Sequence, residues 1–226
     1  MDAKGQIGAL RIYHGSLNAT LTPVFSGGMD YHDYGNGFYC TEDLESAREW
    51  ACQHVGVSES YVYPYDLNIG LISSVLDMSE MEPIYWLSAL ARYRYGRNEP
   101  SLRRERRLSF INAFPVNCEQ YEVIVGWRAN DRYFAYLKYF LNSDISYEAV
   151  VKAIALGNLG KQVVVKGMQA YGQLTQAGDK LTISGNDYIK YNKQYLDREK
   201  EAGEQLQLVR DIAGRTLGDI LAQGVI

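Results

Sequence analysis

Short apolar runs that alternate with segments of helical periodicity are the feature that most constrains the fold of this chain. Glycine, proline and asparagine bound these runs, a pattern typical of β-strands, whereas apolar residues three and four positions apart indicate helices. Strands and helices mixed in this way favour the α+β class. The pattern predicts strands over about 9–13, 37–41, 60–67, 71–77, 121–127 and 162–166.

Five segments before residue 180 are expected to be helical because their apolar side chains fall on one face. The first, 41–54, is expected to begin at Thr41 as the N-cap, and Trp50 and Trp86 are expected to be core residues. The other predicted helices span 82–95, 131–141, 146–156 (with Ser146 as N-cap and Gly157 as its stop) and 168–174.

The last part of the chain changes in character, because residues 187–212 are rich in charge, lack proline and carry apolar residues at helical spacing. This pattern predicts a long helix that ends near Gly214, followed by a short one. We therefore expect one domain over residues 1–180 and a helical C-terminal extension over 181–226, packed on the domain or on a partner.

The composition indicates a soluble globular protein, with 46% hydrophobic and 22% charged residues. A formal net charge of −4 argues against a general nucleic-acid binder. No apolar run is long enough to span a membrane, and the N-terminus lacks the basic and apolar regions of a secretion signal. Cys40, Cys52 and Cys118 are odd in number, so we expect reduced thiols and a cytoplasmic protein.

One basic segment departs from the acidic average. Residues 92–107 hold seven arginines against Glu99 and Glu105, a local charge of +5 from seven positive and two negative side chains. A solvated helix face or a polar loop is the simpler interpretation. The other is an anion site for phosphates, RNA or an acidic protein, since guanidinium groups bind phosphate bidentately.

Two short motifs stand out as candidates for ligand binding. His14, Gly15 and Ser16 follow the first predicted strand, and Gly35-Asn36-Gly37-Phe38-Tyr39 contains a G-x-G that lacks the third glycine of the dinucleotide fingerprint and precedes a strand. Glycines here allow close approach of the backbone to a flat or phosphorylated group. The cysteine and histidine spacings fit no zinc site, and Cys40 is expected to face the core rather than act as a nucleophile.

These motifs resemble the first two motifs of the ADP-ribosyltransferase superfamily, in its histidine–tyrosine branch of diphtheria-type toxins and poly(ADP-ribose) polymerases. Tyr34 and Ala47 also occupy matching positions. More narrowly, the chain is similar over about 10–180 to an uncharacterised bacterial family placed in that superfamily. The stretches that carry this similarity are "IYHGS", "DYGNGFYCT", "AREWA", "YEVIVGWRANDRYFAYL" and "GKQVVVK".

The resemblance implies an ADP-ribosyltransferase-like split β-sheet core flanked by helices, with NAD as substrate and no metal. The Gly15 backbone would pair with the nicotinamide carboxamide, Ser16 would bond the same amide or a neighbouring carbonyl, His14 would hold a ribose hydroxyl, and Tyr39 would stack on the nicotinamide. The implied cofactor-binding set is His14, Gly15, Ser16, Gly35, Gly37, Phe38, Tyr39 and Thr41.

The third motif departs from the family, because Gln162 stands where active members carry a glutamate. A glutamine accepts a hydrogen bond from a ribose hydroxyl but brings no charge. Three interpretations stay open: Gln162 supports transfer, as in mono-transferases with a non-acidic third residue; a carboxylate from Glu119, Glu122 or Asp131 substitutes; or the domain binds NAD without turnover.

The resulting expectation is an NAD-dependent mono-ADP-ribosyltransferase with His14, Tyr39 and Gln162 as catalytic residues. Its acceptor would be an unidentified protein or nucleic acid. The resemblance suggests a bacterial toxin paired with a small antitoxin-like protein and working in the cytoplasm. The alternative is an inactive module that binds NAD or ADP-ribose, or that docks a partner.

Overall fold

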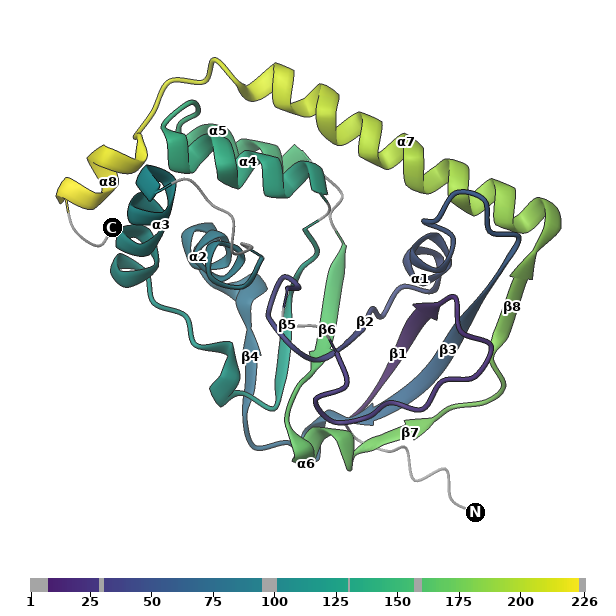
Figure 1. Cartoon of the computed structure of the whole chain (residues 1–226). Coiled ribbons are helices and arrows are strands. Elements are labelled where there is room, and N and C mark those ends of the chain that lie inside the picture. The colour runs from purple at the N-terminus through teal and green to yellow at the C-terminus, as the bar shows by residue number, and fades with distance from the viewer. Residues whose placement is uncertain (1–7, 29–30, 95–100, 130, 157–159, 224–226) are drawn as a thin grey trace.

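A computed structural model describes residues 8–28, 31–94, 101–129, 131–156 and 160–223 (Figure 1). Eight strands lie in this part of the chain, and the first six match the predicted ones within a few residues. They are β1 (Ala9–Ser16), β2 (Phe38–Cys40), β3 (Glu59–Asn68), β4 (Val75–Asp77), β5 (Val123–Trp127), β6 (Lys161–Val165), β7 (Leu174–Gln176) and β8 (Leu181–Ser184).

Eight α-helices surround the strands in the described part of the chain. They are α1 (Leu44–Ala51), α2 (Pro83–Tyr93), α3 (Ser101–Ala113), α4 (Asp131–Asn142), α5 (Tyr147–Leu156), α6 (Met168–Tyr171), α7 (Gly185–Val209) and α8 (Leu217–Gln223). Short 3-10 turns also occur, and they are η1 (Ile69–Leu71), η2 (Met78–Glu80) and η3 (Cys118–Gln120).

The first sheet is built on the long strand β3. Strand β1 pairs with it antiparallel along its whole length, from Ala9 opposite Asn68 to Ser16 opposite Tyr61. Strands β7 and β8 share its other edge, β7 at the C-terminal end of β3 and β8 at the N-terminal end. The chain therefore returns to this sheet after residue 170, through two short strands that the sequence did not predict.

The second sheet has the order β2-β6-β5-β4, with β4 and β5 parallel and the other pairs antiparallel. Its central strands carry consecutive valines, and Val163, Val164 and Val165 are all fully buried because both faces of the sheet are covered. Two open sheets and flanking helices make the chain α+β, which confirms the predicted class.

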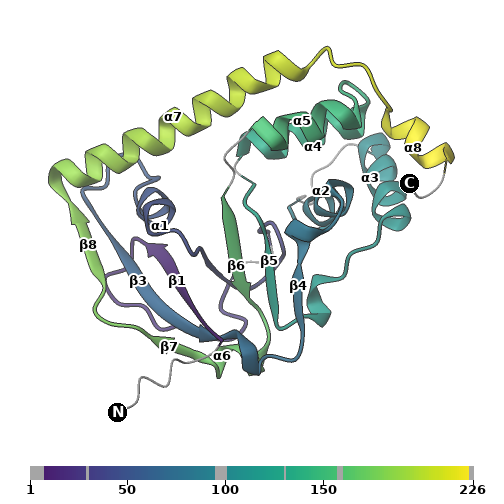
Figure 2. The ribbon, with the colours of Figure 1, turned by 180° about the vertical axis from the view of Figure 1, so that it is seen from behind.

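The helices divide between the two sheets. Helix α1 packs against β1 and β3, whereas α2, α3, α4, α5 and α8 gather beside the second sheet (Figure 1). Helix α7 runs along one side of the whole molecule and contacts α1, α4 and α5, as the view from behind also shows (Figure 2). It ends at Val209, about one turn before the predicted end near Gly214, and α8 is the short helix expected after it.

Two predicted helix caps have different outcomes. Ser146 caps α5 as expected, because its Oγ accepts a hydrogen bond from Ala149 N at 3.1 Å. The prediction of Thr41 as the cap of α1 is wrong. Asp43 is the N-cap and accepts from Ser46 N at 2.7 Å, while Thr41 pairs with β1 in an isolated bridge. The predicted stop at Gly157 lies outside the described residues.

The arginine-rich segment contains a helix, α3, that the sequence did not predict. Arg103 donates to Asn142 Oδ1 at 3.3 Å, and Arg106 donates to Asn142 O at 3.1 Å, at the end of α4. Arg107 donates to Ala91 O at 3.2 Å in the last turn of α2. Helix carbonyls at a C-terminus lack partners within the helix and favour cations. These three arginines thus bond to neighbouring helices, which neither interpretation of the segment foresaw, and an anion site there stays a prediction.

All three cysteines are buried and form no disulfide. Within the described residues, no group of three His, Cys, Asp or Glu side chains is placed to hold a metal ion. Across the same residues, none of the helices has both the length and the apolar character needed to span a bilayer.

Candidate functional site

A cavity of about 870 Å³ lies where β1 of the first sheet meets β2 and β6 of the second. The two sheets are joined there by the pair Tyr13 and Thr41, whose backbone groups exchange hydrogen bonds of 2.8 and 3.0 Å. The walls come from β1, β2, α1, α6, α7, the ends of β5 and β6, and the chain between β1 and β2. Segments far apart in the sequence therefore converge on one space.

His14 lies in the wall of this cavity, on β1. Its Nδ1 is 2.7 Å from the carbonyl oxygen of Tyr39, and its ring stacks on Phe38 with centroids 4.4 Å apart. A carbonyl only accepts, so Nδ1 carries the proton and Nε2 of the neutral ring is left as an acceptor. Burial lowers the pKa of His14, which keeps the ring neutral near pH 7.

Tyr39 lines the same cavity, and its hydroxyl bonds to the backbone at the start of the glycine motif. The hydroxyl donates to Gly35 O at 2.6 Å and accepts from Tyr34 N at 3.0 Å. Burial raises the pKa of Tyr39 well above its ordinary range, so the phenol stays neutral. The ring of His32, which also lines the cavity, has its centre 4.9 Å from that of the Tyr39 ring.

The missing side chain of Gly15 has a structural reason that the sequence analysis did not foresee. A β-carbon there would lie 2.5 Å from Ala47 O and 2.7 Å from Ala51 N, both in the backbone of α1. Gly37 is similarly constrained, since a β-carbon would lie 2.6 Å from Val164 Cγ1. Both glycines line the cavity, but close packing between elements already requires them.

Three residues of the implied NAD-binding set do not appear among the described residues that line the cavity. Ser16 Oγ accepts from Asn18 N at 3.1 Å, and Thr41 Oγ1 donates to Lys161 O at 3.0 Å. Gly35 adopts a φ of +78°, which suits glycine in the turn before β2. These residues shape the strands and turns beside the cavity.

A buried polar network surrounds Gln162 at the start of β6. Its Nε2 donates to Asp33 Oδ2 at 2.8 Å and to Trp127 O at 3.2 Å. The same Asp33 oxygen accepts from Ala129 N at 2.8 Å, and Arg94 lies 3.3 Å from Oδ1. Both amide protons of Gln162 are thus engaged. No hydrogen bond among the described residues ends on its Oε1, and Gln162 is among the residues that line the cavity.

Asp33 is the carboxylate among the described residues that line this cavity, and it was not among the substitutes expected for the missing glutamate. Burial raises its pKa, against the opposing effects of Arg94 and of the hydrogen bonds from Ala129 and Gln162. Asp33 immediately precedes Tyr34, the aromatic residue before Gly35. This position beside the glycine motif was the signal in the sequence that could have identified it.

Two of the three carboxylates considered from the sequence, Glu119 and Glu122, lie away from this cavity. Glu119 pairs with Lys166 at 3.2 Å, and Glu122 accepts from Ala170 N at 3.0 Å. Both line a separate, smaller cavity of about 310 Å³ rather than the one beside His14. The side chain of Asp131 lies outside the described residues.

Trp50, Arg128 and Tyr195 are further cavity residues that the sequence analysis missed. Trp50 was expected in the core, as Trp86 is, but it is only half-buried and lines the cavity. The Arg128 guanidinium lies 4.4 Å from the centre of its ring. Tyr195 shows that α7 contributes to the wall, which follows from the packing of that helix beside α1.

The variant Gln162→Glu is expected to lose about 2–4 kcal/mol of stability near neutral pH, because an oxygen would replace the Nε2 donor beside a carboxylate and a carbonyl. Two carboxyl groups so close share a proton, so the pKa of the pair rises. The loss of stability in the variant should therefore become smaller as the pH falls through the raised pKa of the carboxyl pair. Melting temperatures between pH 5 and 8 test this, with Gln176→Glu on the exposed part of β7 as control. Equal stability of the variant and the wild type at pH 8 would contradict the amide orientation described above.

The fold and the cavity together define an α+β protein with a polar, aromatic-lined site between two sheets. The chain belongs to the family described as "Protein of unknown function (DUF3990)", whose sequence model matches residues 10–175. This match runs from the second residue of β1 into β7, and it stops before β8 and α7. No curated protein matches the chain.

Proposed function

We propose that this protein transfers ADP-ribose from NAD to a macromolecular acceptor. The observation that carries the proposal is that His14, Tyr39 and Gln162, from three distant parts of the sequence, line one cavity. These are the positions that the resemblance to ADP-ribosyltransferases assigns to catalysis. The cavity volume also falls within the range of about 300–1,000 Å³ that is usual for small-molecule sites.

The chemistry of NAD cleavage suits this set of groups. The bond between nicotinamide and ribose breaks through an oxocarbenium-like state, as in glycoside hydrolysis. Positive charge develops on the ribose, and a fixed negative charge beside it stabilises that state. In this proposal, Gln162 Oε1 accepts from a ribose hydroxyl, and Asp33, bonded to the other end of the same amide, supplies the charge that the glutamine lacks.

His14 and Tyr39 bind the two ends of the substrate in this proposal. The free Nε2 of His14 accepts from a ribose hydroxyl, and the Tyr39 ring packs on the nicotinamide. Because the Tyr39 carbonyl fixes the His14 ring, the two residues are positioned as a unit before substrate binds. Such orientation can contribute several kcal/mol to catalysis, up to about 7–11 kcal/mol in favourable intramolecular reactions.

The two four-stranded sheets that meet at the cavity support an ADP-ribosyltransferase-like split core as part of this proposal. The acceptor would be a protein or a nucleic acid, and the protein would act in the bacterial cytoplasm, as a toxin with a small antitoxin-like partner. This last step follows from the resemblance alone.

A module that binds NAD or ADP-ribose without turnover is the second candidate, and one observation favours it. Arg94 lies 3.3 Å from Asp33, so the negative charge of the carboxylate is partly compensated within the protein. A compensated carboxylate stabilises a developing cation less than a free one does.

Nicotinamide release from NAD tests the proposal directly. We expect the wild-type protein to release nicotinamide and His14→Ala to do so at least about tenfold more slowly, because the variant loses a hydrogen bond in the transition state. His54→Ala is the matched control, since that side chain is exposed and does not line the cavity.

The outcomes separate the two candidates. Binding of NAD that raises the melting temperature, without release of nicotinamide in the presence of cell extract, would favour the binding module. The absence of both NAD binding and nicotinamide release would contradict both candidates.

A further inference from the structure

Arg128 follows β5 directly and is among the residues that line the cavity. Its backbone N donates to Gly160 O at 3.3 Å, which holds it beside the start of β6. The guanidinium carbon lies 4.4 Å from the ring centre of Trp50 and 5.9 Å from that of Tyr195. The side chain is therefore positioned by aromatic rings from α1 and α7.

The guanidinium of Arg128 makes no hydrogen bond or ion pair with any residue in the part of the chain that the structure describes. The neighbouring carboxylates act on it only through space. Asp33 is already paired with Arg94, and Glu49 is paired with Arg198 at 2.8 Å.

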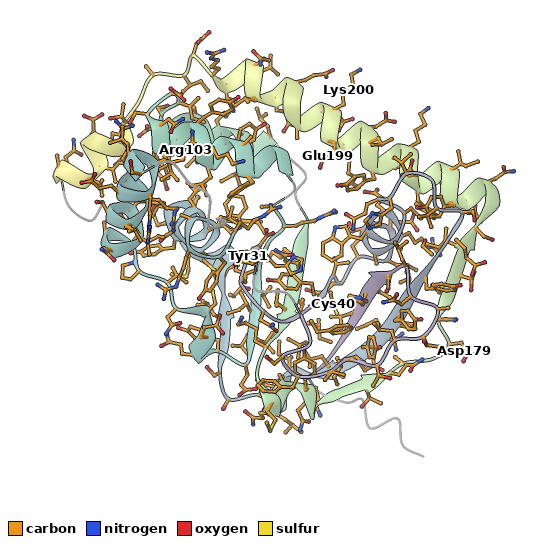
Figure 3. All side chains as sticks on the ribbon, viewed as in Figure 1. Tyr31, Cys40, Arg103, Asp179, Glu199 and Lys200 are labelled. Atoms are coloured by element: carbon orange, nitrogen blue, oxygen red, sulfur yellow. The ribbon has the colours of Figure 1, made fainter. Side chains whose placement is uncertain are left out.

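Helix α7 supplies the third nearby carboxylate, Glu199. Figure 3 shows Glu199 on the side of α7 that faces the body of the protein, while Lys200 points outward. Tyr195 and Glu199 are one turn apart on α7, so the inner face of this helix forms both the aromatic and the acidic surroundings of Arg128.

The charge state of Arg128 matters because its side chain is half-buried, and a charge partly withdrawn from water without a partner is costly. Burial lowers its pKa to about 10, so the group stays positively charged near pH 7. The guanidinium of arginine is planar and presents its N–H donors as a fork, which can form paired bonds to two oxygens of one anion. Arg94 differs, because it already donates to Ala129 O at 2.9 Å and pairs with Asp33.

We propose that Arg128, beside the rings of Trp50 and Tyr195, is an anion-binding group that takes the diphosphate of a nucleotide in the cavity. The planar fork of arginine matches phosphate oxygens, and aromatic stacking fixes its direction. The identity of the nucleotide rests on the proposed function, but the anion site itself does not. Because Tyr195 lies beyond residue 175, helix α7 completes a site whose other described lining residues fall within the family match.

Calorimetric titration at low salt tests the site with three probes: ADP-ribose, inorganic pyrophosphate and adenosine. We expect Arg128→Gln to weaken ADP-ribose and pyrophosphate about 10- to 100-fold, as the loss of charged hydrogen bonds predicts, and to leave adenosine unaffected. Arg128→Lys should fall between, since an ammonium group keeps the charge but not the fork. Arg104→Gln on the exposed face of α3 changes the net charge equally and should bind like the wild type.

Several outcomes would overturn the inference. The first is failure of the wild type to bind pyrophosphate and ADP-ribose. The second is binding of both probes by Arg128→Gln with the wild-type affinity. The third is that Arg128→Gln loses adenosine binding as much as ADP-ribose binding and melts at a lower temperature, which would show a structural role only. Failure of the proposed function gives a different result, namely Arg128-dependent binding of ADP-ribose and pyrophosphate without nicotinamide release from NAD. If Arg128→Gln turns over NAD with the KM of the wild type, the proposed function is supported and the anion site at Arg128 is contradicted.

Discussion

The variant Gly15→Ala is expected to lose about 3 kcal/mol or more of folding stability, close to the upper end of overpacking effects. The added β-carbon would lie 2.5 Å from Ala47 O, 2.7 Å from Ala51 N and 3.2 Å from Ala51 Cα. All three atoms belong to the backbone, so no side chain can rotate away, and α1 must shift from β1. In a chain of this length, the melting temperature should fall by about 10 °C.

Gly218→Ala is the matched control for this experiment. A β-carbon at residue 218 meets only Thr216 Oγ1, at 3.7 Å, and alanine is favoured over glycine within a helix such as α8 by about 1 kcal/mol. This control should therefore melt at the wild-type temperature or slightly above it. Wild-type stability of Gly15→Ala would show that α1 and β1 are packed less closely than described here.

The effect at Gly15 also limits how activity data at this position are interpreted. Helix α1 carries Trp50, so a shift of the helix alters the cavity wall even if no ligand contacts Gly15. Loss of activity in Gly15→Ala alone would not demonstrate a bond between the Gly15 backbone and a nicotinamide amide. Variants at His14 and Asp33, which do not add atoms against a backbone, are better tests of binding and catalysis.

The α+β class and six strands were predictable because their signals are local. Alternating and continuous apolar runs bounded by turn residues mark β1 to β6 without knowledge of their neighbours. Strands β7 and β8 were not predicted, because each has only three or four residues, mostly half-buried or exposed. Both are strands through their pairing with β3. Helix α3 was not predicted because its surface is rich in arginine, and its buried residues, Phe110 and Ile111, lie only near its C-terminal end.

The candidate site was predictable only where its residues belong to short motifs. His14 and the residues around Tyr39 lie in such motifs, and the structure brings them together in one cavity. Asp33 and Arg128 carry no periodicity or spacing that marks them, and their proximity depends on how the two sheets meet. The position of Arg128 directly after a buried strand was a usable signal, since ligand-binding residues concentrate in such connections.

The variant Asp33→Asn is expected to release nicotinamide at least about 100-fold more slowly than the wild type while remaining folded. Loss of one preorganised electrostatic group commonly costs about 10²–10³ in rate. The fold should survive because an asparagine oxygen can still accept from Ala129 N and Gln162 Nε2. Asp179→Asn is the control with the same charge change, since Asp179 is exposed between β7 and β8, away from α7 (Figure 3).

The pH dependence gives a second, independent test of Asp33. Burial raises its pKa above the ordinary value of 3.8, so its contribution to stability is present in full below 3.8 and is lost as the pH rises through the raised value. Activity should change in the opposite direction, because the transition state needs the charged carboxylate. Over the same pH window the wild type should therefore gain activity while it loses stability, and Asp33→Asn should show neither change. A stability change without an activity change would assign Asp33 a structural role and leave Gln162 without its charged partner in catalysis.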